Sequence, residues 1–161
     1  MLKSTSIKIA NKYFRIAFDS QMHGDIIEAR SNYLASIEIH PTAEAFVNLG
    51  WTYGKENNYE DAIRFCHKAL SLNPDYGMAY SDIGYYLFQT GEIDEAVFWL
   101  EEAVNMENFD GKFYAYYNLA KAYERKGEWI KAIKMFDKSL ELKPGFKLGK
   151  KKLLTLSAKL N

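Results

Sequence analysis

A single cysteine, Cys66, is present among the 161 residues, and no stretch of the chain stays apolar for long. One thiol cannot form an internal disulfide, which excludes a disulfide-stapled secreted domain. No run of about 18 apolar residues occurs, so the sequence predicts no membrane-spanning helix. Residues 1–8 lack the apolar stretch of a secretory signal, and we therefore expect a soluble cytoplasmic protein.

The chain also lacks net charge, because its 21 basic and 21 acidic side chains cancel. A neutral chain creates no whole-molecule field that would attract nucleic acid or an anionic membrane surface, so we expect neither as a partner. One short basic segment near the end of the chain, Lys147–Lys152, favours nucleic acid. A steep salt dependence in a DNA or RNA titration would be needed to support that alternative.

Groups of side chains that could carry out catalysis are not recognisable in the sequence. The histidines His23, His40 and His67 form no pair at metal-ligand spacing, and a lone cysteine does not complete a zinc site. Cys66 occupies an apolar position of its unit, where a buried thiol behaves as a small hydrophobic side chain. There is no glycine-rich phosphate loop and no pocket for paired carboxylates. We expect neither an enzyme nor a bound metal or cofactor.

Aromatic residues are abundant instead, since 12 Tyr, 10 Phe and 3 Trp make up 16% of the chain. They recur with a period that the three prolines reveal, because each proline follows an alanine by twelve residues. These pairs are Ala29 with Pro41, Ala62 with Pro74, and Ala132 with Pro144; Ala96 has Asn108 at the same spacing. Reading outward from them divides the chain into four units, 10–42, 43–76, 77–112 and 113–146.

The same residue types return at the same positions of every unit. The fourth position is aromatic in all four units: Tyr13, Phe46, Tyr80 and Tyr116. The seventh and eighth positions read Ile16-Ala17, Leu49-Gly50, Ile83-Gly84 and Leu119-Ala120. This pattern resembles the tetratricopeptide repeat, which reads W-x₂-L-G-x₂-Y, then A-x₃-F, then P over about 34 residues. The resemblance covers roughly residues 10–146 and implies an all-α, right-handed α-solenoid of antiparallel helix pairs, with about nine helices in a single domain, 1–161.

The physical pattern of each unit agrees with that fold. Every unit holds two stretches with apolar residues at helical spacing, separated by residues that commonly end helices. These breaks fall at Gly24, Asn57-Asn58, Gly91 and Gly127. Small residues at the eighth and twentieth positions allow the two helices to approach closely. Unit three is two residues longer than unit two, so we expect a looser turn before unit four.

A final stretch predicts a capping helix at about 146–160. Phe146, Leu153, Leu154 and Leu160 lie at helical spacing, and six lysines with no acidic residue among them lie between positions 143 and 159. A solenoid needs a polar outer face on its last helix.

A binding face is predicted on the first helix of each unit, opposite the packed positions. Its candidate residues are Arg15, Phe18, Asn48, Trp51, Asp82, Tyr85, Phe88, Tyr114, Tyr117, Asn118 and Lys121. Aromatic side chains offer contact area at low entropic cost, and amides can bond to the backbone of an extended peptide. Asn48 and Asn118 resemble the asparagine ladder of some tetratricopeptide proteins. Packing of the aromatic residues into the core, and amide bonds to a neighbouring helix, are the competing interpretations.

The leading hypothesis is a protein-binding adaptor, scaffold or secretion-type chaperone whose aromatic concave groove holds a peptide or protein segment. Binding of a heat-shock chaperone tail is not expected, because the lysines and asparagines of a carboxylate clamp are absent: units one and two have Phe14/Phe18 and Val47/Trp51 instead. The alternative is a self-associating module, in which the acidic stretch 92–110 meets the lysine-rich tail of another copy. Concentration-dependent size would favour that alternative.

Overall fold

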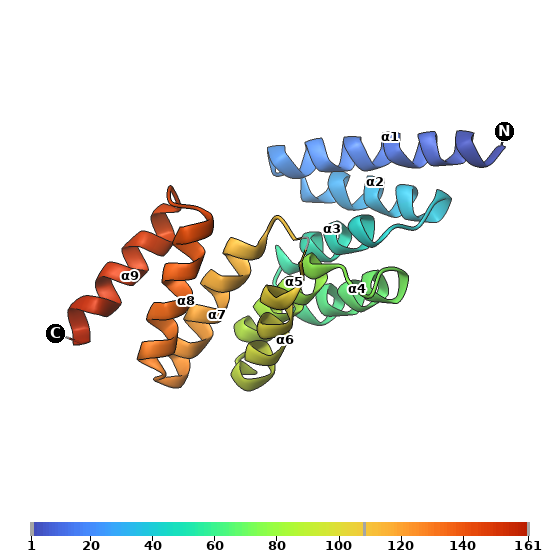
Figure 1. Cartoon of the computed structure of the whole chain (residues 1–161). Helices are drawn as coiled ribbons and strands as arrows, with labels where there is room; N and C mark the ends of the chain where they lie inside the picture. The colour runs from blue at the N-terminus through green and yellow to red at the C-terminus, as the bar shows by residue number, and fades with distance from the viewer. Residues whose placement is uncertain (1, 108, 161) are drawn as a thin grey trace. The chain divides into compact units, whose positions relative to one another are not determined.

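The computed structural model describes residues 2–107 and 109–160, and over these residues the chain forms nine helices and no strand. The all-α fold class is therefore confirmed. Figure 1 shows successive helices running back and forth, joined by short turns. The helices are α1 (Leu2–His23), α2 (Ile26–Ile39), α3 (Ala43–Gly54), α4 (Tyr59–Leu72), α5 (Gly77–Thr90), α6 (Ile93–Asn105), α7 (Lys112–Lys126), α8 (Trp129–Leu142) and α9 (Lys147–Leu160).

The turn inside each predicted unit contains one residue with a positive φ angle. These residues are Gly24, Asn57, Gly91 and Gly127, with φ between 61° and 92°. Left-handed backbone ends a helix in one step, and glycine adopts it without a Cβ penalty. The next helix then starts on a side-chain cap in two cases: Asp25 accepts from the Glu28 amide at 3.0 Å and Asn58 from the Asp61 amide at 3.3 Å. The predicted helix breaks are confirmed.

Small residues bring the two helices of a pair together. The alanines shared by all units are completely buried: Ala29, Ala62, Ala96 and Ala132. At Gly84 of α5, a Cβ atom would lie 2.5 Å from Cγ of Leu100 on α6. At Gly50 of α3 it would lie 2.9 Å from the carbonyl oxygen of Ala62 on α4. The predicted close approach at the eighth and twentieth positions is confirmed at both pairs.

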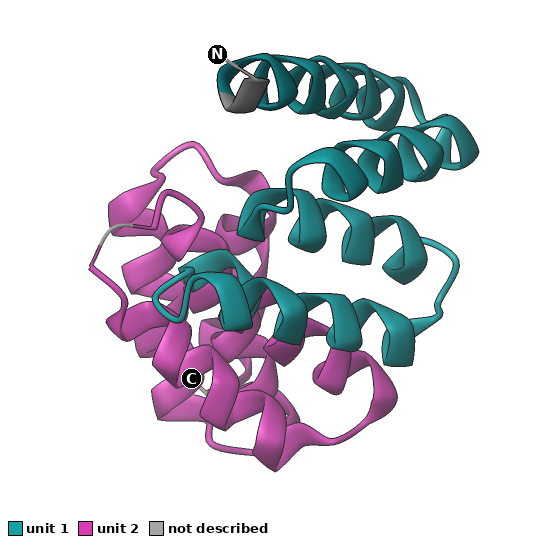
Figure 2. Ribbon diagram, turned by 90° about the vertical axis from the view of Figure 1, so that its right-hand side faces the viewer, with its two compact units in different colours: residues 1–79 teal, residues 80–161 magenta. Residues whose placement is uncertain are grey.

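The helices group into two compact units, residues 1–79 and 80–161, with the boundary inside α5 (Figure 2). We call them unit 1 and unit 2; they are distinct from the four shorter units predicted from the sequence. Unit 1 has a core cluster around Ala17, Ala29, Tyr33, Leu49 and Phe65. The largest core cluster of unit 2 includes Leu100, Leu119, Ala132, Phe136 and Leu156. A single domain over the whole chain stays a prediction.

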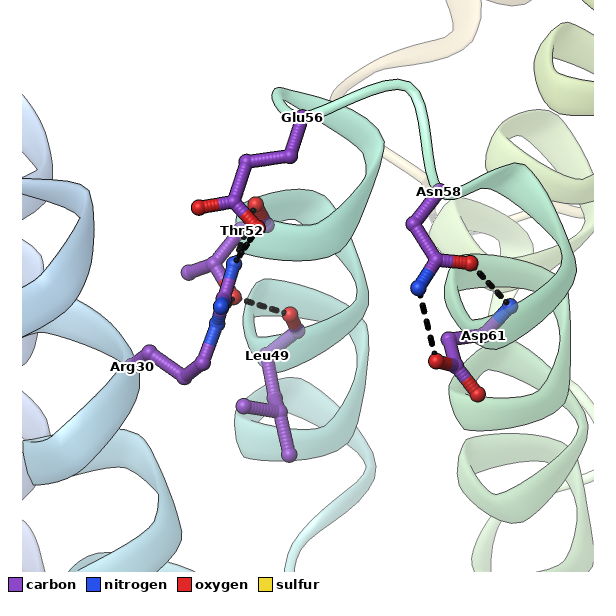
Figure 3. A network of polar contacts seen from close by, with 6 residues as sticks. All are labelled: Arg30, Leu49, Thr52, Glu56, Asn58 and Asp61. Atoms are coloured by element: carbon purple, nitrogen blue, oxygen red, sulfur yellow. Dashed lines mark hydrogen bonds and ion pairs between the residues drawn. The ribbon is translucent and has the colours of Figure 1, made fainter.

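Polar contacts join consecutive helix pairs inside unit 1. Arg30 of α2 donates to the Thr52 carbonyl oxygen at 3.0 Å and to Glu56 at 2.7 Å (Figure 3). Its guanidinium also lies 4.2 Å from the Tyr53 ring centroid. The Thr52 hydroxyl is fully buried and donates to the Leu49 carbonyl oxygen at 2.7 Å. Because Thr52 lies on α3, this network holds α2 against α3.

The connection between α6 and α7 agrees with the sequence prediction, whereas the buried face of the last helix differs from it. Residues 106–111 connect α6 to α7, whereas residues 143–146 connect α8 to α9, so the first connection is two residues longer (six against four), as predicted; residue 108 lies outside the described residues. The capping helix is present as α9. Among its described side chains, Leu156 is the buried leucine, at 2% exposure, whereas the predicted Leu154 is 69% exposed.

Candidate functional site

The predicted site residues of unit 1 lie on α1 and α3. Arg15 is exposed, and Phe18 is 44% exposed. The half-buried Asn48 donates its amide to the Glu44 carbonyl oxygen at 2.9 Å, which leaves its own side-chain oxygen as an acceptor. Trp51 is half-buried, with the Lys55 ammonium 5.0 Å from its ring centroid. No hydrogen bond, ion pair or ring contact joins these four residues to one another in the described part of the unit.

In unit 2, the aromatic residues of α7 are joined into a cluster by Phe146, which precedes α9. The Phe146 ring lies 5.5 Å from Tyr114 and 5.1 Å from Tyr117, centroid to centroid. Tyr117 also contacts Phe136 of α8 at 5.7 Å and is buried, whereas Tyr114 remains 44% exposed. Tyr117 is thus a core residue at the edge of the predicted face, and Tyr114 is a surface residue of it.

Lys121 connects α7 to α5. Its ammonium lies 4.7 Å from the Phe88 ring centroid and 5.7 Å from that of Tyr117, distances at which a cation is attracted to an aromatic face. Desolvation by burial lowers the pKa of the Lys121 ammonium, and the positive charge of Lys152 lowers it further. Lys152 of α9 is itself paired with Glu124 of α7 at 2.9 Å.

Asp82 of α5 and Asn118 of α7 have no bonded partner among the described residues. Asp82 is half-buried, and desolvation raises the pKa of its carboxyl to about 7. Asn118 is only 5% exposed. Every fully enclosed side-chain nitrogen or oxygen in the described chain has a hydrogen-bond partner, so the polar atoms of Asn118 must reach the surface.

We define the α5–α7 face by the predicted site residues of unit 2, of which Tyr117 and Asn118 are buried. It consists of Asp82, Tyr85, Phe88, Tyr114, Tyr117, Asn118 and Lys121. Tyr85 is half-buried, with its ring 5.5 Å from Tyr86. The ring and cation contacts connect Phe88, Lys121, Tyr117 and Tyr114 in sequence. Asp82 and Tyr85 lie on the same side of α5 because they are three residues apart.

Exposed apolar residues also occur outside the predicted binding face. Ile27 is 77% exposed and Ile130 is 83% exposed, each at the second position of a second helix. Trp129 and Phe98 are 41% and 57% exposed. A signal was present, because the eighteenth position is acidic in units two and three, Glu60 and Asp94, but isoleucine in units one and four.

Among the described residues, no group of three or more histidine, cysteine, aspartate or glutamate side chains is placed to hold a metal ion. Cys66 is buried, as predicted. None of the described helices is both long and apolar enough to cross a membrane.

Helix pairs with small residues at fixed contact positions define the class of helical-repeat proteins. The family model described as tetratricopeptide repeat matches residues 43–76 and 113–146, and a second model with the same description matches residues 79–110. These matches cover more than half of the chain. The chain therefore belongs to the tetratricopeptide-repeat family, whose fold supports protein–protein interaction.

Comparison with individual proteins gives the same family. The photosystem I assembly protein Ycf3 of Acaryochloris marina is 29% identical over 100 residues, 60% of this chain and 60% of that protein. The chain thus spans less than two thirds of the length of this relative. Among solved structures, PilF of Pseudomonas aeruginosa superposes with a TM-score of 0.89 at 20% identity, covering 96% of this chain and 70% of PilF. MamA has a TM-score of 0.71 at 27% identity, with coverages of 92% and 81%.

Proposed function

We propose that this chain is a non-catalytic adaptor, scaffold or chaperone-like protein that binds a peptide or protein segment on the aromatic faces of its first helices. In this proposal residues 10–42 form the first of four repeats, and Arg15, Phe18, Asn48 and Trp51 supply the binding residues of unit 1. The α5–α7 face supplies those of unit 2.

The observation that carries the proposal is the composition of the α5–α7 face. It combines partly exposed aromatic rings with an acid and an amide that have no bonded partner in the described chain. Large aromatic side chains and a few convergent polar groups are typical of the centres of protein-binding sites. A residue needed only for packing would be buried like Tyr117, not 44% exposed like Tyr114.

Similarity to Ycf3 supports a role in assembly. The name of that relative describes an assembly protein, and its similarity to this chain extends over 100 residues, 60% of the chain. We therefore favour a partner that is itself a component of a larger complex.

The test is affinity capture from a lysate of the cells that make this protein. We compare the wild type with the triple variant Trp51→Ala/Tyr85→Ala/Asn118→Ala, after its folding has been verified by circular dichroism. A matched control carries three alanine substitutions at exposed positions of second helices, His67→Ala/Lys134→Ala/Asp137→Ala. We expect a protein that is retained by the wild type and the control and lost by the triple variant. Equal capture by all three proteins would contradict binding on the first helices.

Self-association is the second candidate function, and a specific observation favours it. Glu95 and Asp94 of α6 are exposed beside the 57% exposed Phe98, and α9 presents exposed lysines with Leu148 at 53% exposure. Opposite charges around apolar residues can direct two copies together, although they contribute modestly to affinity. Sedimentation velocity over a hundredfold range of protein concentration, at low and high salt, tests this candidate. A constant monomer would exclude it.

A further inference from the structure

Asp82 is an acid that the described protein does not neutralise. Two other half-buried acids of unit 2 have lysine partners: Glu124 pairs with Lys152 at 2.9 Å, and Glu128 with Lys131 at 2.5 Å. No hydrogen bond or ion pair from a described residue reaches the Asp82 carboxylate, and burial is the cause of its raised pKa. A half-buried carboxylate without a counter-charge is unfavourable, and folded proteins normally pair such a group.

The cation on the neighbouring helix does not serve as that counter-charge. Lys121 is held over the Phe88 and Tyr117 rings, and the charges that shift its pKa are those of Lys152 and Glu124. Asp82 is not among them. The α5–α7 face therefore carries a positive group whose surroundings are aromatic and, separately, a negative group whose surroundings contain no cation.

The neighbours of Asp82 are suited to an incoming side chain. Tyr85 and Gln89 follow it by three and seven residues, which places all three on one side of α5. The face also contains Asn118, a residue 95% buried whose amide makes no side-chain hydrogen bond within the described chain. Two polar groups at the sixth position of their predicted units, one on α5 and one on α7, thus lack a bonded partner among the described residues.

We propose that Asp82 is the docking point for a lysine or arginine side chain of the bound protein segment, with Asn118 bonding to the backbone of that segment. The inference rests on the proposed function, because it names the chemistry of the partner at the same face. A guanidinium or ammonium group supplies both the missing charge and the missing hydrogen bonds of the carboxylate. The aliphatic stem and the cation can also lie against an aromatic ring, as Lys121 already does on Phe88.

The partner is therefore a segment that carries a basic residue next to apolar residues. An acidic segment fits poorly at this position, since Asp82 would repel it. A second copy of this chain could also bring a lysine of α9, since Lys152 is engaged with Glu124 but other lysines of that helix are exposed. We commit to a segment of another protein, and self-binding becomes an outcome of the test.

The experiment starts from an unbiased displayed library of twelve-residue peptides, panned on the full-length chain. Parallel selections use D82N and the control D137N, which makes the same chemical change at an exposed position of α8. Asparagine keeps the shape of aspartate and removes only its charge, so D82N is expected to stay folded; circular dichroism verifies this. Selected peptides are then synthesised with a fluorophore, each in its original form and with its basic residue replaced by glutamine.

The expected result is a basic residue at one fixed position of the peptides recovered by the wild type and by D137N. Fluorescence anisotropy then shows at least a tenfold loss of affinity for D82N. The peptide with glutamine binds the wild type equally weakly, and D82N does not distinguish the two peptides, so the two substitutions are coupled.

Three other results would overturn the inference. Peptides that bind the wild type and D82N equally, but are weakened by Tyr85→Ala, would leave the proposed function standing without a role for Asp82. Absence of any peptide binding that depends on either residue would remove both proposals. A concentration-dependent dimer that D82N abolishes would show that a second copy, not another protein, occupies Asp82.

Discussion

At the scale of single residues, the four left-handed positions Gly24, Asn57, Gly91 and Gly127 are each the fifteenth residue of a predicted unit. Three are glycine. The fourth, Asn57, tolerates this backbone better than most side chains do, and its side-chain oxygen accepts a bond from the Tyr59 hydroxyl at 2.8 Å. The repeat therefore preserves a backbone conformation at this position even where the residue type changes.

Gly91→Ala tests the backbone requirement in isolation. A Cβ at Gly91 would meet no atom within 4 Å, but φ is +92°, so the substitution adds strain without a clash. We expect the free energy of unfolding to fall by about 1–2 kcal/mol, the cost of left-handed backbone for an L-residue. Gly145→Ala is the control, since that site is equally open and has no positive φ. Urea unfolding followed by circular dichroism measures both, and an equal effect of the two substitutions would contradict the argument.

Asp82→Asn tests whether the carboxylate of Asp82 destabilises the free protein. Its pKa is about 7 in the folded chain, above the value of about 4 expected when unfolded, so the folded state holds the proton more tightly between these values. Stability should therefore fall as pH rises from 4 to 7 and remain reduced above 7.

The asparagine variant should lose that dependence on pH. We expect it to be more stable than the wild type by about 1–3 kcal/mol at pH 8, a range reduced for the partial exposure of the residue, and nearly equal at pH 4. Urea unfolding at both pH values measures the difference. A variant that is less stable at pH 8 would show that the carboxylate has a stabilising partner.

At the scale of helices, the contact between the two members of a pair depends on small residues. Ala96 of α6 is fully buried, and its carbonyl oxygen would lie 3.1 Å from a Cβ at Gly84 of α5. Such a contact has no space for extra methyl groups, because protein interiors are closely packed.

Ala96→Leu should therefore overpack the α5–α6 pair. We expect the free energy of unfolding to fall by about 1–3 kcal/mol. Ala158→Leu, at an exposed position of α9, adds the same atoms without burial and should change stability little. Urea unfolding compares the two variants; a leucine at position 96 that is tolerated as well as one at position 158 would mean that the pair can separate without cost.

Helices and their breaks were predictable from the sequence because the signals are local. Turn residues, caps and the spacing of small residues act within a few positions, and they repeat four times. The face of the last helix was less predictable. Leu153, Leu154 and Leu156 are all compatible with a helical pattern, and only the packing of α9 on α8 selects Leu156 for burial. Because α9 lies after the last repeat, no repeated pattern in the sequence indicates which of its leucines is buried.

At the scale of the whole molecule, the contacts among the candidate site residues could not be predicted from the sequence. Spacing alone placed Tyr114, Tyr117, Asn118 and Lys121 on one side of α7. It could not show that Tyr117 is covered by Phe146, or that Lys121 contacts Phe88, because those contacts depend on how separate helices meet. The isolation of Asp82 from any cation is likewise a property of the folded chain alone.

The central claim is that a partner protein contacts the first helices of the repeats. The most direct measurement is photo-crosslinking in the cells that make this protein, with a photoreactive amino acid placed at Tyr114 of α7 in one sample and at Asp137 of α8 in another. Both positions are exposed, so the photoreactive group is accessible to a partner in either sample. We expect a partner protein to be crosslinked from position 114 and to be absent from the adducts of position 137. A partner crosslinked from position 137 and not from 114 would place binding on the second helices and contradict the account.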